Sequence, residues 1–267
     1  MPVYDSIGQS YSNSRLPDPR IVDSILNLLQ LELGGTIADI GAGTGGYSTS
    51  LANRGYQLYA VEPSLVMRSQ SSPHPQVTWF EGYAEDIPLP TKSVDGVISI
   101  LAVHHFSNLE KAIREMDRVN KQGSRIVILT FDPRLVKNFW FTDYFPSLWE
   151  DTFRVFPPLS KVVELICTNT QTTVEVSTLM LPHNLSDLFA AALWRRPEIY
   201  LNPVVRAGIS AFALAEAEAE VVELGVRQLN QELSNGQWNA KYGNIKALAE
   251  FDAGYRFLCA SDRALLA

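Results

Sequence analysis

The sequence predicts an α/β fold in which a seven-stranded, mostly parallel sheet carries an inserted helical cap. Three observations support this prediction. The first half alternates short β-like apolar runs with helical patterns, as chains with parallel sheets do. One run, residues 95–101, is almost continuously apolar, which suits a central strand covered on both faces. A loop with glycines at alternate positions, residues 41–45, separates a predicted strand from a predicted helix.

Local signals place the elements of the first half. Asp18-Pro19 is typical of a helix N-cap followed by proline, and the apolar spacing after it predicts a helix that ends near residue 29. Further helices are expected from Tyr47 to about Asn53, from residue 64, and over residues 110–119. The predicted strands are residues 36–40, 57–62, 77–81, 95–101 and 125–131.

The second half is richer in aromatic and helical segments. Eight aromatic residues fall within positions 139–156, more than one helix needs for packing. A sixth strand is expected at residues 173–181 and a last one at 254–260. Residues 183–235 are expected to be helical throughout, including the alternating run Ala215–Glu220, because alanine and glutamate favour helix strongly.

Composition narrows the class of protein. The chain has 267 residues, 46% of them hydrophobic, which is enough to bury a full core. A net charge of −7 disfavours nucleic acid as a partner, because phosphate binding usually needs a basic face. Cys167 and Cys259 have no metal or redox spacing, and no apolar run reaches transmembrane length. We therefore expect a cytoplasmic enzyme or binding protein; oligomeric state is not indicated.

The glycine loop fits two kinds of cofactor site. Gly41, Gly43 and Gly46 match the dinucleotide loop of Rossmann oxidoreductases, whereas Gly41, Gly43 and Gly45 match the nucleotide loop of class I methyltransferases. Both patterns expect an acid at the end of the second strand, where a carboxylate can accept hydrogen bonds from both ribose hydroxyls. Glu62 stands there, 21 residues after the first glycine.

Three further features favour the methyltransferase loop. Asp39 precedes the glycines, where a carboxylate suits a ligand with an ammonium group better than a pyrophosphate. The other two are segments 82–90 and 94–106. Together with DIGAGTG (39–45), VEPS followed by Met67, and RIVILTF (125–131), they make residues 36–131 resemble the small-molecule branch of class I S-adenosylmethionine-dependent methyltransferases, the group that includes the ubiquinone/menaquinone methyltransferases.

The resemblance implies a Rossmann-like core, S-adenosylmethionine as cofactor, and an antiparallel closing strand at GYRFLCA (254–260). It also implies roles for single residues. The glycines would pass under the methionine part of the cofactor, Asp39 would lie near its ammonium group, and Glu62 would hold the ribose. The remaining implied contacts are Pro63 and Met67 packing on adenine, the Ala84 amide and Glu85 binding the adenine edge, and Leu101 touching the cofactor through its backbone.

Two parts of the chain fit the resemblance less closely. Many relatives carry Asp where this chain has Tyr83, so Glu85 or Asp86 would replace that carboxylate. The segment around Tyr11 and Arg15 resembles the family's cofactor lid, in which Tyr11 would cover the methyl group and Arg15 would pair with the cofactor carboxylate. The implied division is a lid and first helix at 1–35, a cofactor-binding core at 36–132, a substrate cap at 133–171 and 183–235, and core-completing elements at 172–182 and 236–267.

The acceptor side offers fewer candidates. His104 and His105 follow the fourth strand, at the edge where open α/β sheets bind ligands, and are candidates for a catalytic base. Adjacent residues do not share a helix face, so we expect no metal site there. The aromatic run could supply an apolar acceptor cavity. If the acceptor is a carboxylate it needs no base, and Arg195 or Arg196 could clamp it.

Two other functions remain open on sequence grounds. A nicotinamide oxidoreductase would need only the glycine spacing, although Asp39 and residues 82–90 count against it. NADH binding without S-adenosylmethionine binding would establish that function. A non-catalytic, cofactor-binding regulatory protein could keep the loop and lack the chemistry. A cap without an open cavity would favour that alternative.

Overall fold

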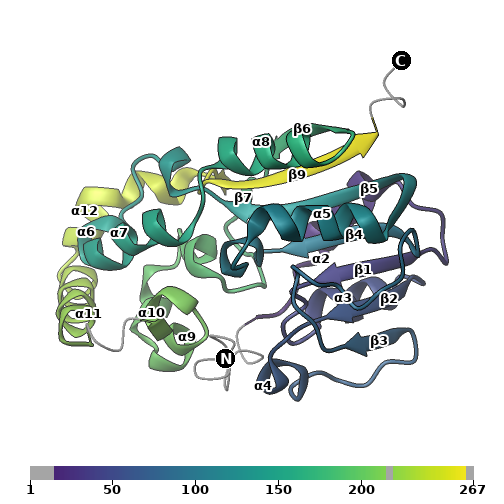
Figure 1. Cartoon of the computed structure of the whole chain (residues 1–267). Helices are drawn as coiled ribbons and strands as arrows, with labels where there is room; N and C mark the ends of the chain where they lie inside the picture. Colours follow the sequence, from purple (N-terminus) through teal and green to yellow (C-terminus); the bar gives the residue numbers. More distant parts are fainter. Residues whose placement is uncertain (1–14, 215–218, 263–267) are drawn as a thin grey trace.

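A computed structural model describes residues 15–214 and 219–262 (Figure 1). Within these ranges, seven strands form one sheet in the order β3-β2-β1-β4-β5-β9-β6. Strand β9 runs antiparallel between β5 and β6, and the pairs among β1 to β5 are all parallel. The predicted sheet and its antiparallel closing strand are therefore confirmed. The strands are β1 Thr36–Ile40, β2 Gln57–Val61, β3 Val77–Phe80, β4 Val94–Ile100, β5 Asn120–Phe131, β6 Thr172–Thr178 and β9 Tyr255–Asp262.

The register places the ends of three central strands beside one another. Ile40 pairs with Val61, and Asp39 pairs with Ile98, so β1, β2 and β4 finish at the same edge of the sheet. Strand β1 lies between β2 and β4, which makes this edge the topological switch point. Open α/β sheets bind ligands at such a point, because the loops after the neighbouring strands diverge there.

Helices cover both faces of this sheet. Asp18 caps α2 by accepting a hydrogen bond from the backbone amide of Arg20, as the sequence predicts, and the helix buries Ile21, Val22, Ile25 and Leu29. On the other face α5 packs against α8, and Met116, Val162 and Ile166 belong to one buried cluster. The core helices are α2 Pro19–Leu29, α3 Gly46–Ala52, α4 Leu65–Arg68, α5 Leu109–Val119 and α8 Leu159–Asn169.

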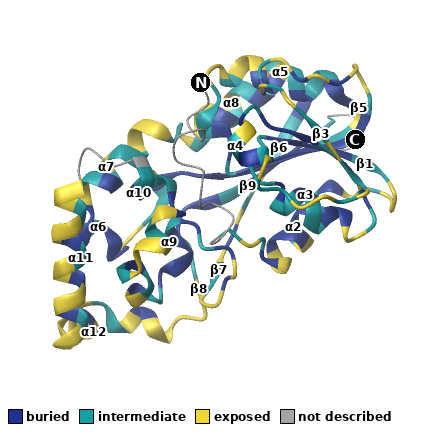
Figure 2. Cartoon of the chain, turned by 90° about the horizontal axis from the view of Figure 1, so that it is seen from below, coloured by how far each residue is buried: buried dark blue, intermediate teal, exposed yellow. Residues whose placement is uncertain are grey.

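A helical cap stands beyond one end of the sheet (Figures 1 and 2). Trp140 lies at its centre: the indole packs 5.5 Å from the ring of Tyr200 and 5.6 Å from that of Trp238, and its Nε1 donates to the carbonyl of Trp194. No helix in the described ranges combines the length and apolarity needed to cross a membrane. The cap elements are α6 Phe141–Tyr144, α7 Pro146–Val155, α9 Pro203–Ala207, α10 Ser210–Leu214, α11 Ala219–Ser234, α12 Gln237–Tyr242 and the 3₁₀ turns at Ala190–Leu193, Pro197–Leu201 and Gly243–Ala247.

The cap departs from the sequence prediction in three places. Helix α8 was expected to belong to the cap. It instead packs beside the sheet, because Val162 and Ile166 form an apolar face against α5. Helix α12 packs against α11, so residues 237–242 do not complete the core as expected. Residues 183–189 are not helical: Leu181–Pro182 (β7) pairs with Glu250–Phe251 (β8), and the chain then turns toward the N-terminal segment. Residues 215–218 of the alanine-glutamate run lie outside the described residues.

Candidate cofactor and acceptor site

A cavity of about 290 Å³, here called the first cavity, opens at the switch point. Ten of the predicted site residues line it. Asp39, Gly45 and His104 do not line it, and Tyr11 lies outside the described residues. The ten are Arg15, Gly41, Gly43, Glu62, Pro63, Met67, Ala84, Glu85, Leu101 and His105.

Glu62 is the most firmly oriented polar side chain in the first cavity. It follows β2 directly and is only 7% exposed. One carboxylate oxygen accepts from the Gly43 amide at 3.0 Å, and the other accepts from the Ser64 amide at 2.9 Å. Because a carboxylate can accept about four hydrogen bonds, capacity remains for two ligand hydroxyls. The glycine loop and the acid are thus one hydrogen-bonded unit.

The three glycines have the same backbone conformation but different neighbours. Gly41, Gly43 and Gly45 all have positive φ, between 58° and 76°, which L side chains rarely adopt. A Cβ at Gly41 would lie 2.6 Å from the Cβ of Ala102, and one at Gly45 would lie 2.5 Å from the Trp79 ring. At Gly43 the nearest atom is the flexible end of Met67, at 3.3 Å. Gly41 and Gly45 therefore fit the fold tightly, whereas Gly43 leaves space beside the cavity.

Asp39 lies behind the glycine loop rather than in the cavity wall. It is 2% exposed, and its carboxyl group accepts a hydrogen bond from the Ser48 hydroxyl at 2.6 Å. Burial raises the pKa of Asp39 to about 7; the Ser48 hydrogen bond opposes this rise, and the nearby Glu62 carboxylate adds to it. A cation bound near Asp39 would favour its ionised form. This response matches the ammonium partner that the resemblance implies.

The side of the first cavity expected to hold adenine is formed by Pro63, Met67, Ala84 and Glu85. Met67 and Ala84 are buried, so they present apolar surface to a ring. Glu85 is held by the loop before α5, because its carboxylate accepts from the Ser107 hydroxyl at 2.8 Å and the Asn108 amide at 2.9 Å. These bonds fix Glu85 beside the cavity while using part of its accepting capacity.

Leu101 has a strained backbone at the end of β4. Its φ of 54° lies in the left-handed region, and its amide donates to the carbonyl of Leu129 at 2.8 Å. Non-glycine residues in this region cost about 1–3 kcal/mol and persist where the surroundings impose them, often at functional sites. Leu101 lines both the first cavity and a second one.

Arg15 meets an acid that the sequence did not single out. Its Nε donates to Asp187 at 2.5 Å and its second terminal nitrogen donates at 3.3 Å, while the Tyr47 hydroxyl donates to the same carboxylate at 2.9 Å. Asp187 is 1% exposed and lines the first cavity. Arg15, which was expected in the cofactor lid, is therefore ion-paired with the loop that follows β7.

The two histidines face different cavities. His105 lines the first cavity, and His104 lines a second cavity of about 70 Å³. Their rings lie 3.8 Å apart. Burial lowers the pKa of His105 to about 4; burial, together with the charges of His105 and Arg15, holds the pKa of His104 well below its ordinary value. Both imidazoles are therefore neutral near pH 7.

Arg195 and Arg196 line neither of these two cavities. Arg195 donates to the carbonyl of Leu248 at 3.2 Å, and Arg196 donates to that of Leu185 at 2.9 Å. Their guanidinium groups fasten backbone segments of the cap. The hypothesis that they clamp an acceptor carboxylate is not supported by their positions.

Sequence reasoning missed other residues that line the first cavity. Pro17, Thr44 and Gly46 come from segments already singled out, and Ala102, Phe106 and Ser107 flank the histidine pair, so proximity to these motifs could have found them. Tyr47 follows the glycine loop directly and could have been found in the same way. Asp187 carried no such signal, because its contact with Tyr47 joins residues 140 positions apart.

The fold and the site define an α/β protein whose cavity at the carboxyl edge of the sheet suits a nucleoside cofactor. A family model for a methyltransferase domain matches residues 38–128. The chain is 58% identical to a proposed methyltransferase from an antibiotic biosynthesis pathway of Anabaena variabilis ATCC 29413; the match covers 93% of this chain and 99% of that one, with a TM-score of 0.90. The chain therefore belongs to the class I S-adenosylmethionine-dependent methyltransferases, and the nicotinamide alternative is set aside.

More distant similarities show the range of this fold. A ubiquinone/menaquinone biosynthesis C-methyltransferase of Rubrivivax gelatinosus is 31% identical over 130 residues, which are 48% of this chain and 49% of that relative. The chain spans about half or less of the length of the curated relatives it matches. The cyclase SpnF has the same fold, with a TM-score of 0.60 at 15% identity over 97% of this chain and 94% of that one. The fold alone therefore does not fix the reaction.

Proposed function

We propose that this protein transfers the methyl group of S-adenosylmethionine to a small-molecule acceptor. The observation that carries the proposal is Glu62, held at the switch point by the amides of Gly43 and Ser64 inside the first cavity. A carboxylate fixed in this way suits a ribose with two free hydroxyls. The same cavity has an apolar wall for a base and a buried acid, Asp39, behind the glycine loop.

Each end of the cofactor has a candidate partner. Met67 and Pro63 offer apolar contact to the adenine, and Ala84 and Glu85 lie at its expected edge. Asp39 and the glycine loop suit the charged amino group, and Arg15 suits the carboxylate. These residues fit the chemical groups of S-adenosylmethionine from one end of the molecule to the other.

For methyl transfer, the main task of the protein is to position the acceptor and the cofactor. The sulfonium supplies an already activated methyl group, which an acceptor lone pair displaces in line. Holding the two reactants in line can remove roughly 7–11 kcal/mol from the barrier of a bimolecular step. The neighbouring ends of β1, β2 and β4 supply a rigid frame for this positioning.

Calorimetric titration with S-adenosylmethionine and its demethylated product tests the proposal, with NADH as the negative ligand. We expect micromolar binding of both sulfur compounds and none of NADH. Glu62→Gln should weaken that binding at least tenfold, because an amide cannot accept from both backbone donors and the ribose. Glu81→Gln is the matched control: Glu81 lies close by in sequence, but it is exposed and pairs with Arg68 outside the cavity.

The negative result is equally clear. If folded protein free of copurified ligand binds neither sulfur compound, the proposed function fails. If Glu62→Gln and Glu81→Gln bind equally well, the cofactor lies elsewhere than the first cavity.

A further inference from the structure

The second cavity lies directly beside the first. Leu101 and Arg15 line both of them, so the two spaces are separated by the end of β4 and the N-terminal segment. Its walls come from distant parts of the chain, including the ends of β5 and β9, α7, and the turn between α9 and α10. A molecule in this cavity would therefore lie next to a cofactor in the first one.

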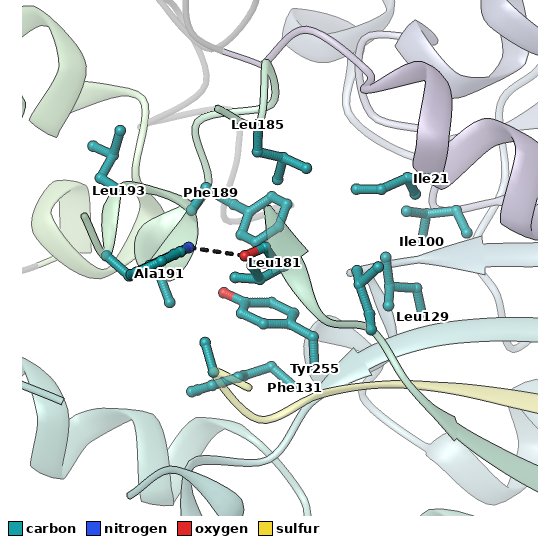
Figure 3. Packing of buried hydrophobic residues seen from close by; sticks show 14 of the residues in the cluster. Ile21, Ile100, Leu129, Phe131, Leu181, Leu185, Phe189, Ala191, Leu193 and Tyr255 are labelled. Atoms are coloured by element: carbon teal, nitrogen blue, oxygen red, sulfur yellow. Dashed lines mark hydrogen bonds between the residues drawn. The ribbon is translucent and has the colours of Figure 1, made fainter. Parts of the chain in front are cut away.

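Seven of the seventeen residues that line the second cavity are phenylalanine, tryptophan or tyrosine. Phe131 lies 5.0 Å from Phe156 and 4.9 Å from Tyr255, measured between ring centres, and Phe189 lies 4.6 Å from Tyr255. Figure 3 shows the side chains of Phe131, Phe189 and Tyr255 lying close to one another. Offset and edge-on ring contacts of this kind suit another planar ring.

Charge is scarce in the second cavity. Among the described residues that line it, Arg15 is the only one with a permanent charge, and its guanidinium is already bound to Asp187. Burying an anion without a partner of its own is costly. Arg195 and Arg196 are not among the residues that line it. The surroundings therefore favour an uncharged ligand over a carboxylate.

His104 provides the polar contact. Its ring stacks on Phe156 at 3.9 Å, and its Nδ1 is buried without a hydrogen-bond partner. A buried polar atom left unsatisfied calls for an explanation, and an incomplete ligand site is one. His104, rather than His105, is therefore the histidine placed beside an acceptor.

We propose that the second cavity binds an uncharged hydroxylated aromatic ring and that His104 accepts the hydroxyl proton during O-methylation. This inference rests on the proposed function. The acceptor oxygen forms a bond to the methyl carbon, the carbon–sulfur bond breaks, and its electron pair stays on sulfur in S-adenosylhomocysteine. The proton passes to the imidazole and then to solvent. The positive charge on sulfur disappears as the imidazolium forms, so the site keeps the same charge.

Binding of two probes to the protein saturated with S-adenosylhomocysteine tests the ligand class. We expect 2-naphthol to bind at least tenfold more tightly than 2-naphthoate, its anionic counterpart. Phe156→Leu should weaken 2-naphthol binding at least fivefold and leave S-adenosylhomocysteine binding unchanged. Phe153→Leu is the matched control three residues earlier, in α7, since Phe153 is exposed and does not line the cavity.

Turnover tests the role of His104. With S-adenosylmethionine present, His104→Asn should slow methylation of 2-naphthol at least tenfold, but slow methylation of 2-aminonaphthalene much less. The amine is uncharged and attacks through its lone pair before it loses a proton, whereas the naphthol needs a base. An equal loss with both acceptors would overturn His104 as the proton acceptor.

The remaining outcomes separate this inference from the proposed function. If S-adenosylhomocysteine binds but 2-naphthol does not, or if 2-naphthoate binds as well, the acceptor class is wrong and the cofactor assignment stands. Absence of methyl transfer to bound 2-naphthol would also overturn the acceptor class. If S-adenosylhomocysteine itself does not bind, both proposals fail.

Discussion

Arg15 and Asp187 are 172 residues apart in the sequence and form a two-point ion pair on the wall of the first cavity. Tyr47, at the start of α3, donates to the same carboxylate. Asp187, in the loop that follows β7, thereby orients the guanidinium of Arg15 from the N-terminal segment and the hydroxyl of Tyr47 from the core. Nearby, Asp18 accepts from Arg20 and from the amide of Ser186, so it joins the same two segments outside the cavity.

This arrangement predicts that Asp187 positions the cofactor site while Asp18 only fastens the segments. Asp187→Asn should weaken S-adenosylmethionine binding roughly tenfold, because the amide holds Arg15 less firmly. Asp18→Asn should lower the melting temperature and leave that affinity within about twofold. Calorimetry and thermal unfolding of the two variants check this. Equal losses of affinity would mean that both acids act only through the docking of the segments.

Substitutions at Gly41 and Gly43 should affect stability and ligand binding to different degrees. Gly41→Ala should destabilise the fold by roughly 1–3 kcal/mol, because its Cβ would press on Ala102 in a backbone conformation that suits glycine. Gly43→Ala should destabilise it less, since the Met67 end can move, but should still reduce S-adenosylmethionine affinity. Urea unfolding and titration calorimetry measure the two effects. A larger loss of stability at Gly43 than at Gly41 would contradict this ranking.

Because the pKa of buried Asp39 is raised, the free energy of unfolding of the protein should depend on pH. Its pKa is about 7 in the folded protein and ordinarily 3.8, so between these values the folded state binds more protons than the unfolded state. The contribution of Asp39 to stability is therefore full below about pH 4 and is lost as the pH rises toward 7. Each pKa unit corresponds to about 1.4 kcal/mol, so the effect reaches a few kcal/mol.

Urea unfolding between pH 4.5 and 7.5 tests the behaviour of Asp39. The wild-type protein should lose stability over this range relative to Asp39→Asn, whose side chain does not titrate. Parallel pH profiles for the two proteins would show that Asp39 is ionised throughout.

Gly225 lies where α11 packs closely against α6 in the cap. A Cβ at this position of α11 would overlap the carbonyl oxygen of Tyr144 and touch the ring of Phe145. Gly225→Ala should therefore destabilise the protein by roughly 1–3 kcal/mol, although alanine favours helix. Gly243→Ala is the control, because the nearest atom to its Cβ is 3.9 Å away.

Thermal unfolding measures the difference in stability between Gly225→Ala and Gly243→Ala. We expect a melting temperature lowered by about 2–4 °C for each kcal/mol in Gly225→Ala, and a shift near zero in Gly243→Ala. An unchanged melting temperature in Gly225→Ala would show that α11 can move away from α6 at little cost.

The core could be predicted from the sequence because its signals are local. Residues 36–40 were predicted as a strand and form β1, and residues 94–100 form β4 within one residue of the prediction. Buried parallel strands read as continuous apolar runs, and the loops after them carry turn and cofactor residues in a fixed order. Glu62 was found for the same reason, from its spacing to Gly41. Its bond to the Gly43 amide agrees with that reasoning.

The cap could not be predicted in the same way. Asp187 stands in the segment 183–235, which the sequence predicts to be helical throughout. Its carboxylate is instead buried in a non-helical turn, where Arg15 and Tyr47 bind it. Strands β7 and β8 pair residues about 70 positions apart in the sequence. A local periodicity in the sequence cannot indicate such a pairing. The division between the two histidines likewise depends on Phe156 stacking over His104, a contact between distant elements.

The position of β9 has a consequence for the order of folding. This strand forms hydrogen bonds with both β5 and β6, yet it is the last strand of the described chain. Until the ribosome has released residues 255–262, β6 has no neighbour in the sheet and Tyr255 is missing from the second cavity. The nascent chain can therefore assemble its glycine loop and Glu62 early, but it can complete the second cavity only once β9 has been synthesised.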